Sequence, residues 1–302
     1  MKLHHLRDVV AIAERGSLRA AARHLSVAQP ALTRSVRELE RELGVALFER
    51  RTRGMILTPM GSAFVRRAKS VLGEMRRARE EVEQLHGGTG GKVVAGLSLA
   101  AHIALFPKAL SRFRARYPQV QLHVIEGWYP TLEAGLKDGS IDFYVGPEPD
   151  APLPPDLNHE KLFDNTRVIL GRIGHPLGRA KSLRALVGAE WATTSITFRA
   201  EEELHGLFKE HGLPLPRLAL QSQSGITLLI SLANSDLLAM VPVQWTNFPA
   251  VRGMLAPINV KETFRAPSIG VIRRADLPLT PAAEFFLDLL RRGVPRRDYA
   301  KG

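Results

Sequence analysis

The sequence contains no cysteine, and only 6% of its 302 residues are aromatic. Without cysteine, the chain has no disulfide, no thiolate nucleophile and no cysteine-ligated zinc or iron–sulfur cluster. A reducing compartment fits this composition, although a cysteine-free exported protein would fit it too. Because 45% of the residues are apolar, we expect a packed interior, and the length suits two or three domains.

Long apolar runs are also missing. The only unbroken one near the N-terminus, Val9 to Ala13, is too short for the core of a signal peptide, so we do not expect export. The most apolar later region, residues 226 to 243, is not predicted to span a membrane because it is interrupted by Ser231, Asn234, Ser235 and Asp236. We therefore expect a soluble, cytoplasmic protein without a membrane partner.

Acidic residues are scarce relative to basic ones. The 42 Lys and Arg exceed the 30 Asp and Glu, which gives a formal charge of +12 and a pI near 10.4. Such a charge favours a polyanionic partner such as nucleic acid. The excess is concentrated near the N-terminus, since residues 1 to 58 hold eleven Lys or Arg against six acids.

The composition changes at the glycine-rich stretch 86 to 91. The pattern before it is helical and rich in charge, whereas short β-branched runs alternate with helices after it, so the stretch is predicted to be a flexible linker. It superficially resembles a phosphate-binding loop ending at Lys92. We reject that interpretation because the motif requires glycine where His86 stands and Ser or Thr where Val93 stands.

A heptad pattern precedes this linker, between Met60 and Leu85. A single amphipathic helix about 40 Å long is predicted from the standard rise per residue. Its narrow apolar stripe favours pairing with a second helix, whereas packing on its own domain is the alternative. The stripe that we expect to dimerise consists of Phe64, Ala68, Val71, Met75, Ala78, Val82 and Leu85.

Two shorter helices are predicted at the N-terminal end. Ser17 is a suitable N-cap for a helix over residues 18 to 25, and a short turn leads to a second helix that begins near Gln29. Pro30 fits the first turn of this second helix because its missing N–H would have no intrahelical partner there. The proline therefore marks the start of a helix.

The second helix has one apolar and one basic face. At 100° per residue, Leu32, Val36, Leu39 and Leu43 form an inward stripe, and the opposite side carries Pro30, Arg34, Arg37 and Arg41. The acids of this segment, Glu38, Glu40 and Glu42, fall on its flanks. Two helices joined by a tight turn, with a basic outer face on the second, are typical of a helix-turn-helix that inserts into the major groove.

A short basic hairpin is predicted over residues 48 to 57, with its turn near Gly54. Its arginines, Arg50, Arg51 and Arg53, could clamp a phosphate or a minor groove. A solvated surface loop is the alternative interpretation. Beside a helix-turn-helix, the hairpin is better interpreted as the wing of a winged helix.

Residues 1 to 62 resemble the DNA-binding domain of LysR-type transcriptional regulators. The residues that carry the resemblance are Gly16-Ser17, Ala21-Ala22, Leu25, Gln29-Pro30-Ala31-Leu32-Thr33, Leu39-Glu40, Leu43-Gly44, Leu47-Phe48, Arg50, Leu57-Thr58-Pro59 and Gly61. The sequence departs from the family at Ala28 and Thr33, where Ser is usual. Alanine is a poor N-cap, at a typical cost near 1 kcal/mol, whereas Thr33 keeps a hydroxyl.

Side-chain chemistry assigns roles to this surface. We hypothesise that Gln29, Ala31 and Arg34 meet base edges, since Gln suits adenine, Arg suits guanine and the alanine methyl suits thymine. Phosphates would be held by Ser17, Thr33, Arg50, Arg51 and Arg53, and Pro30 and Arg37 complete the candidate DNA-binding set.

The rest of the chain alternates strands and helices. Strands are predicted at residues 92 to 99, 120 to 126, 141 to 146, 166 to 172, 190 to 194, 217 to 220 and 238 to 241, with helices at 102 to 117 and 131 to 138. This alternation predicts parallel sheets covered by helices. Ligands of such sheets bind outside the carboxyl ends of the strands.

The strand ends therefore supply the candidate ligand site. Several of their residues directly precede a helix, where free N–H groups favour an anion, but a single residue at such a position is more often a helix cap than a ligand. Because aromatic residues lie near these ends, a small aromatic or other organic acid is the expected effector. The candidate effector-binding residues are Ser98, Ala100, His102, Trp128, Tyr129, Tyr144, Gly146, Thr194, Ser195, Phe198, Gln223 and Val241.

Two other classes of protein are less consistent with the sequence. An enzyme could use Ser98 and His102, but no Gly-x-Ser-x-Gly elbow surrounds Ser98, and no His-Glu-x-x-His or comparable metal spacing occurs. We therefore expect no catalysis, cofactor or metal. A solute-binding transport protein would match the second half alone, but it would have an export signal and no helix-turn-helix.

The LysR resemblance implies an architecture for nearly the whole chain. It implies a winged helix-turn-helix (1 to 58), a linker and dimerisation helix with its hinge (59 to 91), and a periplasmic-binding-protein-like α/β effector domain (92 to 302). That domain would contain subdomain I (92 to 164 with 266 to 302) and subdomain II (165 to 265), enclosing a small effector. The implied partners are double-stranded promoter DNA, a second subunit that forms a homodimer, further subunits of a homotetramer, and RNA polymerase.

Overall fold

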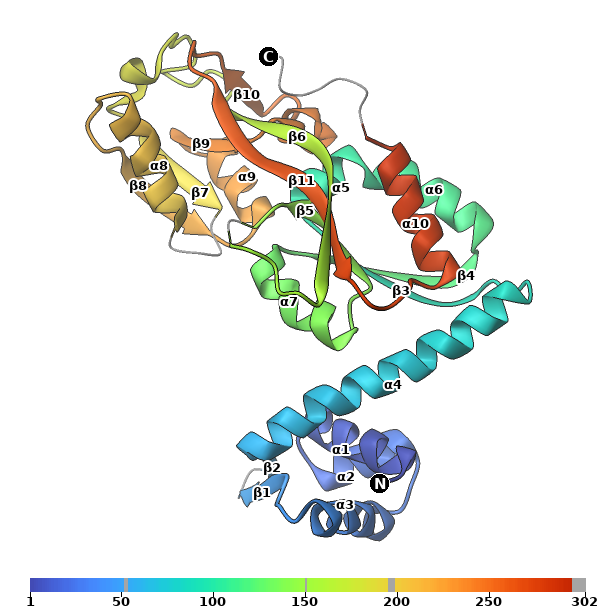
Figure 1. Ribbon diagram of the computed structural model, residues 1–302. Coiled ribbons are helices and arrows are strands. Elements are labelled where there is room, and N and C mark those ends of the chain that lie inside the picture. The colour runs from blue at the N-terminus through green and yellow to red at the C-terminus, as the bar shows by residue number, and fades with distance from the viewer. Residues whose placement is uncertain (52–53, 150, 195–198, 295–302) are drawn as a thin grey trace. The chain divides into compact units, whose positions relative to one another are not determined.

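The computed structural model of the protein describes residues 1–51, 54–149, 151–194 and 199–294 (Figure 1). Contacts divide the chain into two units. The first comprises Met1–Gly88 with Ala134–Ile141, and the second comprises Thr89–Glu133 with Asp142–Gly302. The change at the glycine-rich stretch therefore coincides with a change of structural unit.

The first unit begins with three helices, a hairpin and a long helix. These elements are α1 (Leu3–Arg15), α2 (Leu18–Leu25), α3 (Gln29–Leu43), β1 (Phe48–Arg51), β2 (Gly54–Leu57) and α4 (Pro59–Leu85). The Ser17 hydroxyl accepts a hydrogen bond from the Ala20 amide at 3.2 Å, and Ser26, in the left-handed conformation, ends α2. The antiparallel pairing of β1 with β2 confirms the predicted hairpin beside a helix-turn-helix.

One small core holds these helices together. It includes Ile12 of α1, Leu32 and Leu39 of α3, and Leu47, all at most 1% exposed. The prediction that Leu43 continues the inward stripe is wrong, because its side chain is 38% exposed. Leu43 is the last residue of α3, directly before the left-handed C-cap at Gly44, so it extends past the core that covers the three preceding apolar positions.

The long helix α4 begins one residue before the predicted start. Thr58 caps it by accepting a hydrogen bond from the Gly61 amide at 2.9 Å, and Pro59 occupies its first position. The helix spans 27 residues, which corresponds to about 40 Å. Thus a single continuous helix connects the hairpin to the glycine-rich linker.

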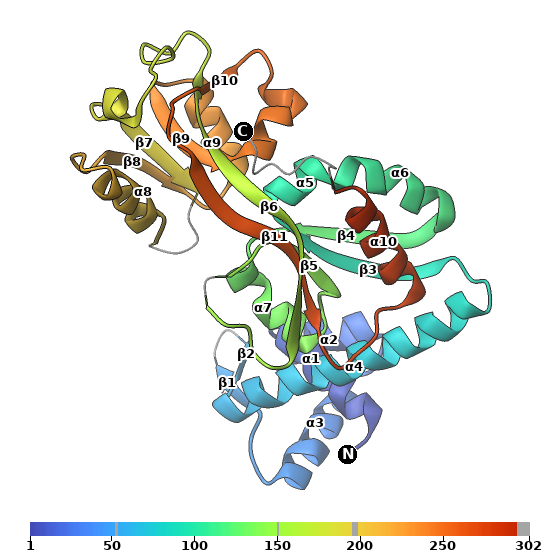
Figure 2. The ribbon, with the colours of Figure 1, turned by 45° about the horizontal axis from the view of Figure 1, so that its top comes forward.

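The second unit is built on one twisted sheet. Its strands are β3 (Gly90–Leu97), β4 (Gln119–Glu126), β5 (Phe143–Pro147), β6 (Leu157–Arg172), β7 (Glu190–Thr194), β8 (Arg217–Ser222), β9 (Leu237–Pro242), β10 (Leu255–Ile258) and β11 (Phe264–Arg274). The order is β4-β3-β5-β11-β6-β9-β7-β8, with β10 added beside β6. Figures 1 and 2 show β6 and β11 running side by side through the middle of this unit.

The expectation of parallel sheets holds for only part of the sheet, which is mixed. The pairs β3–β4, β3–β5, β7–β8 and β7–β9 are parallel, but β6 and β11 pair antiparallel with each other and with their other partners. Strand β6 starts at Leu157, nine residues before the predicted start at 166, and β10 and β11 were not predicted. Prolines explain these omissions, since Pro257 interrupts the strand signal in β10, and Pro267 lies at a register shift in β11.

Helices cover the sheet. They are α5 (Leu99–Ala104), α6 (Phe106–Arg116), α7 (Tyr129–Asp138), α8 (Arg199–Glu210), α9 (Gly225–Ala233) and α10 (Pro281–Arg292), with 3₁₀ turns at Leu183–Leu186, Val243–Asn247 and Pro249–Val251. The helix predicted over 102 to 117 is in fact two, because Pro107 stands in the first turn of α6. Helices α6 and α10 lie side by side on one face of the sheet (Figure 2).

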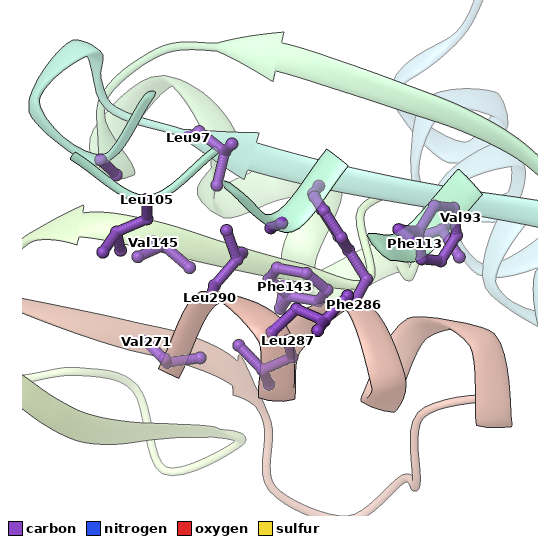
Figure 3. Close-up of a cluster of buried hydrophobic side chains, with 14 of the residues drawn as sticks. Val93, Leu97, Leu105, Phe113, Phe143, Val145, Val271, Phe286, Leu287 and Leu290 are labelled. Atoms are coloured by element: carbon purple, nitrogen blue, oxygen red, sulfur yellow. The ribbon is translucent and has the colours of Figure 1, made fainter. Parts of the chain in front are cut away.

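A large apolar cluster fixes that layer. Phe286, Leu287 and Leu290 of α10 point toward Phe143 and Val145 of β5 (Figure 3). The rings of Phe113 and Phe286 pack with their centroids 5.1 Å apart. The C-terminal helix α10 is therefore part of the same core as strands β3 and β5.

Candidate DNA interface and effector site

The outer face of α3 is the candidate DNA-reading surface. Gln29, Pro30, Ala31, Arg34 and Arg37 are all exposed on it. The inner face is buried at Leu32, Val36 and Leu39, so the two faces of the helix are chemically distinct. The polar and cationic side chains at the start of α3 are thus free to meet base edges.

Two hydroxyls assigned to phosphates already make intramolecular contacts. Thr33 is half-buried, and its hydroxyl donates to the Gln29 carbonyl at 3.0 Å. Ser17 is also half-buried, and its oxygen accepts the α2 cap bond. A phosphate only accepts hydrogen bonds, so Ser17 still has its hydroxyl hydrogen to donate to one, whereas Thr33 must first turn its hydroxyl away from the Gln29 carbonyl. Ala28, which caps α3, offers no side-chain hydrogen bond, so the first amides of that helix lack a side-chain acceptor from it.

Of the three predicted basic side chains of the hairpin, the structure describes that of Arg51. Arg51 is exposed and pairs with Glu49 at 2.9 Å, an exposed pair that a phosphate can replace at little cost. Arg53 lies outside the described residues, and the side chain of Arg50 does so too. At the turn end of the hairpin, where β2 begins, Gly54 has φ 137° and lies so close to the Gly16 carbonyl that a Cβ would be 2.4 Å from its oxygen. This contact docks the hairpin on the turn between α1 and α2.

One acid on α3 has a role that the sequence did not reveal. The Glu40 carboxylate accepts hydrogen bonds from the amides of Leu47 (2.7 Å) and Phe48 (3.2 Å). It thereby ties the reading helix to the first strand of the hairpin. Helical spacing placed Glu40 only on a flank of α3. The one sequence signal that Glu40 has a role was that Leu39-Glu40 is among the residues that carry the LysR resemblance.

The apolar stripe of α4 divides into two parts. Phe64 packs partly buried against the core of the first unit, and Ala68 is 2% exposed. Further along, the side chains of Val71 (47%), Met75 (50%), Val82 (68%) and Leu85 (73%) are exposed. Ala78 is exposed as well. The first two residues thus anchor the helix to its own unit, and the last five leave an apolar stripe uncovered.

In the second unit, the ends of several strands meet. Ser98, directly after β3, caps α5 by accepting from the Ala101 amide at 3.3 Å, and Ser224 caps α9 in the same way through the Thr227 amide at 3.3 Å. A Cβ on Gly225 would lie 2.4 Å from Leu99 Cδ2. The two helix starts are therefore in direct contact, although they are more than a hundred residues apart in the sequence.

Tyrosines occupy the adjacent strand end. The rings of Tyr129 and Tyr144 lie 6.4 Å apart, and the Tyr144 hydroxyl crowds Gly146, where a Cβ would be 2.0 Å from it and 2.9 Å from Ser98 Cβ. Burial raises the pKa of Tyr129 to about 12, and it raises the pKa of Tyr144 as well. Both phenols are therefore neutral hydrogen-bonding groups at physiological pH.

The remaining candidates fall into three groups. His102 is half-buried beside Ser98, with Nδ1 3.2 Å from its carbonyl oxygen, and burial lowers its pKa, so the imidazole is neutral at pH 7. Ala100 and Val241 are buried in apolar clusters. Trp128 and Thr194 are half-buried, Gln223 is exposed, and Ser195 and Phe198 lie outside the described residues.

Sequence reasoning missed one charged residue at this place. Glu126 ends β4, and its Oε1 would be 3.7 Å from a Cβ on Gly225. Its carboxylate also acts electrostatically on His102. A glutamate as the last residue of a predicted strand was the available signal, but only the fold brings it to the start of α9.

Within the described ranges, no cluster of three His, Asp or Glu could hold a metal. No described helix combines the length and apolar character needed to cross a membrane.

Comparison with known proteins identifies the two parts of the chain. The family model "Bacterial regulatory helix-turn-helix protein, lysR family" matches residues 3–62, and the model "LysR substrate binding domain" matches residues 86–295. The chain belongs to the LysR family of transcriptional regulators. Members of this family regulate transcription and are not enzymes, so the winged helix-turn-helix of this regulator is its DNA-binding domain and the α/β part its effector domain.

Individual relatives of this LysR-family chain cover nearly all of it. The "SDS degradation transcriptional activation protein" of a Pseudomonas species is 30% identical over 295 residues, covering 95% of each chain. The regulator GbpR of Azospirillum brasilense is 28% identical over 294 residues, covering 96% of this chain and 86% of its own.

Solved structures show the same fold. The crystal structure of CbnR, a LysR family transcriptional regulator, has a TM-score of 0.71 at 24% identity and covers 98% of this chain and 100% of its own. The structure of full-length CbnR complexed with its target DNA also gives 0.71, at 23% identity and 97% and 100% coverage.

Proposed function

We propose that this LysR-family regulator reads a promoter through the exposed side chains of Gln29, Ala31 and Arg34. The observation that supports this most directly is the division of α3 into a buried apolar face and an exposed polar and basic face. Pro30 and Arg37 lie on the same exposed face, and Ser17, Thr33 and the hairpin arginines Arg50, Arg51 and Arg53 hold phosphates. The complex forms in the cytoplasm.

The regulator pairs through α4. The five exposed apolar residues from Val71 to Leu85 recur at heptad spacing, which suits a second copy of the same helix. A two-fold protein imposes two-fold symmetry on its site, so the operator is a pseudo-palindrome. Two such dimers form a homotetramer on one promoter, where RNA polymerase is the further partner.

The effector domain binds a small molecule where the strand ends meet. The subdomains are residues 92 to 164 with 266 to 302, and residues 165 to 265, and the site lies around Ser98, Tyr144 and Gly146. A small aromatic or other organic acid is the proposed class of effector, with the first amides of α9 as donors to its anionic group. The nearby Glu126 carboxylate repels anions, so it disfavours a ligand more strongly the more negative charge that ligand carries.

Effector binding changes transcription by shifting a conformational equilibrium. A ligand can shift that equilibrium only by its differential affinity for the two arrangements of the subdomains. The arrangement that the ligand favours then sets the spacing of the DNA-binding pairs and the bend of the promoter.

Selection from a random pool of duplexes tests the DNA-binding part of this proposal. The wild-type protein should enrich a two-fold symmetric sequence, and Gln29→Ala should change the enriched bases while Lys2→Ala, a basic residue off the reading helix, should not. Failure to enrich any sequence, or an identical sequence with Gln29→Ala, would contradict the proposal. A footprint with and without benzoate as a first probe, together with its effect on the melting temperature, tests the effector part.

A further inference from the structure

Two polar pairs interrupt the apolar packing between α1 and the reading helix α3. Asp8 of α1 and Ser35 of α3 are only 5% and 7% exposed, and the Ser35 hydroxyl donates to Asp8 Oδ2 at 2.6 Å. One turn away, the 4% exposed His5 lies with Nε2 3.8 Å from the Glu38 carboxylate. Both pairs lie in the first unit, behind the face that meets DNA.

The spacing of these pairs matches the two helices. His5 and Asp8 are three residues apart on α1, and Ser35 and Glu38 are three residues apart on α3. Residues at this spacing lie on the same face of a helix, so the Asp8–Ser35 and His5–Glu38 pairs lie one helical turn apart. The neighbouring positions on α3, Leu32, Val36 and Leu39, are buried and apolar. His5, Asp8 and Ser35 are therefore buried polar residues inside an otherwise apolar interface, and Glu38 lies exposed at its edge.

An apolar interface and a hydrogen bond constrain α3 differently. Leucine and valine can repack after a small rotation of a helix at modest cost. The Asp8 carboxylate cannot, because a rotation of 100°, one residue, would place the apolar Val36 opposite it in one direction, and in the other direction would bury the exposed guanidinium of Arg34 in the interface. A buried carboxylate that loses its donor carries a large desolvation penalty. A buried polar residue can in this way specify the register between two helices, as an asparagine does in coiled coils.

We propose that Asp8 and Ser35 are positioning residues that fix the rotation of the reading helix about its axis, and hence which side chains face the bases. Neither Asp8 nor Ser35 touches DNA. The inference rests on the proposed reading face of α3, and it adds that base discrimination depends on a hydrogen bond buried behind that face.

The test separates stability from discrimination. The double variant Asp8→Leu with Ser35→Ala replaces both partners with apolar groups, a change that is often neutral or stabilising for the fold. We expect its melting temperature to be at or above that of the wild type. The ratio of affinities for the duplex that the wild type enriches and for a shuffled duplex should fall about tenfold, comparable to losing one specific base contact.

Controls define the alternatives. Asp8→Asn keeps an acceptor for the Ser35 hydroxyl, so the affinity ratio of this variant should stay within about twofold of the wild-type ratio. The Ser35→Ala single variant should show the same fall in the affinity ratio as the double variant. The affinity for the shuffled duplex and its salt dependence should not change, because the phosphate-binding cations are intact. If the double variant does not fold, the Ser35→Ala and Asp8→Asn comparison decides.

The inference would be overturned if the folded double variant, or Ser35→Ala, kept the wild-type ratio of affinities for the enriched and the shuffled duplex. So would a loss in Asp8→Asn as large as that in Ser35→Ala. The proposed function fails in a different way, because then the wild type itself enriches no duplex.

Discussion

The substitution Gly61→Ala tests how the linker helix is joined to the DNA-binding domain. Gly61 is the third residue of α4, and a Cβ at this position would lie 1.9 Å from the Leu47 carbonyl oxygen and 2.8 Å from its carbon. Real Cβ contacts are essentially never shorter than 3.0 Å. The two backbone segments must therefore separate by about 1 Å to accept a methyl group.

The surrounding hydrogen bonds resist that separation. The Leu47 carbonyl accepts from the Thr58 amide at 3.0 Å, the Thr58 hydroxyl donates to the Ala46 carbonyl at 2.8 Å, and the Leu47 amide donates to Glu40. Alanine in place of glycine gains up to about 1 kcal/mol of helix propensity. Overpacking costs about 1–3 kcal/mol, and each disrupted hydrogen bond costs about 1 kcal/mol more. We expect a net loss of about 2 kcal/mol.

Differential scanning calorimetry of the full chain measures this loss. A domain of this size loses about 4–8 °C of melting temperature per kcal/mol, so the transition of the DNA-binding unit should fall by about 10 °C. That transition is identified by its rise when duplex DNA is added. Gly73→Ala in the same helix is the matched control, because its nearest neighbouring atom would be 3.6 Å away, so it should leave the transition unchanged or raise it. An unchanged transition in Gly61→Ala, or an equal fall in both variants, would refute the reasoning.

Three further substitutions test the other contacts. Arg51→Ala should weaken binding to all duplexes alike and reduce the slope of log affinity against log salt by about 1, and a change confined to one sequence would contradict a phosphate role. Val82→Asp should convert the proposed α4 dimer to a monomer in sedimentation analysis because it charges the exposed stripe of α4, while Arg79→Ala on the same helix should leave the oligomeric state of the wild type unchanged. Glu40→Ala should destabilise the DNA-binding unit by about 1–3 kcal/mol in thermal unfolding by leaving two amides without their acceptor, whereas Glu40→Gln keeps that acceptor and should cost less.

The DNA-binding domain could be predicted largely from the sequence. Its signals are local: Ser17 caps one helix, Pro30 starts the next, and the leucines of α3 recur at helical spacing. These interactions join residues a few positions apart, so a short stretch of sequence contains both partners. Leu43 shows the limit of this reasoning, since periodicity gives the direction of a side chain but not where the core ends.

The effector domain was predicted less completely. The strand-helix alternation and the candidates at strand ends follow from local patterns, and the contact between α5 and α9 brings two of those ends together. The antiparallel pairing of β6 with β11 joins residues about one hundred positions apart, as in Asn165 with Ala266. No local sequence pattern contains both partners, and Pro267 interrupts the strand pattern of β11.

The sequence by itself determined the helices and the hairpin of the DNA-binding domain, the basic face of α3, the apolar stripe of α4 and the family. Each of these depends on the chemistry and period of neighbouring residues. Only the tertiary structure decided that Glu40 holds the hairpin, that Asp8 meets Ser35, and that Glu126 lies at the start of α9. Such contacts depend on how separate elements pack, because burial and hydrogen bonding across an interface are set by the whole core and by no single segment.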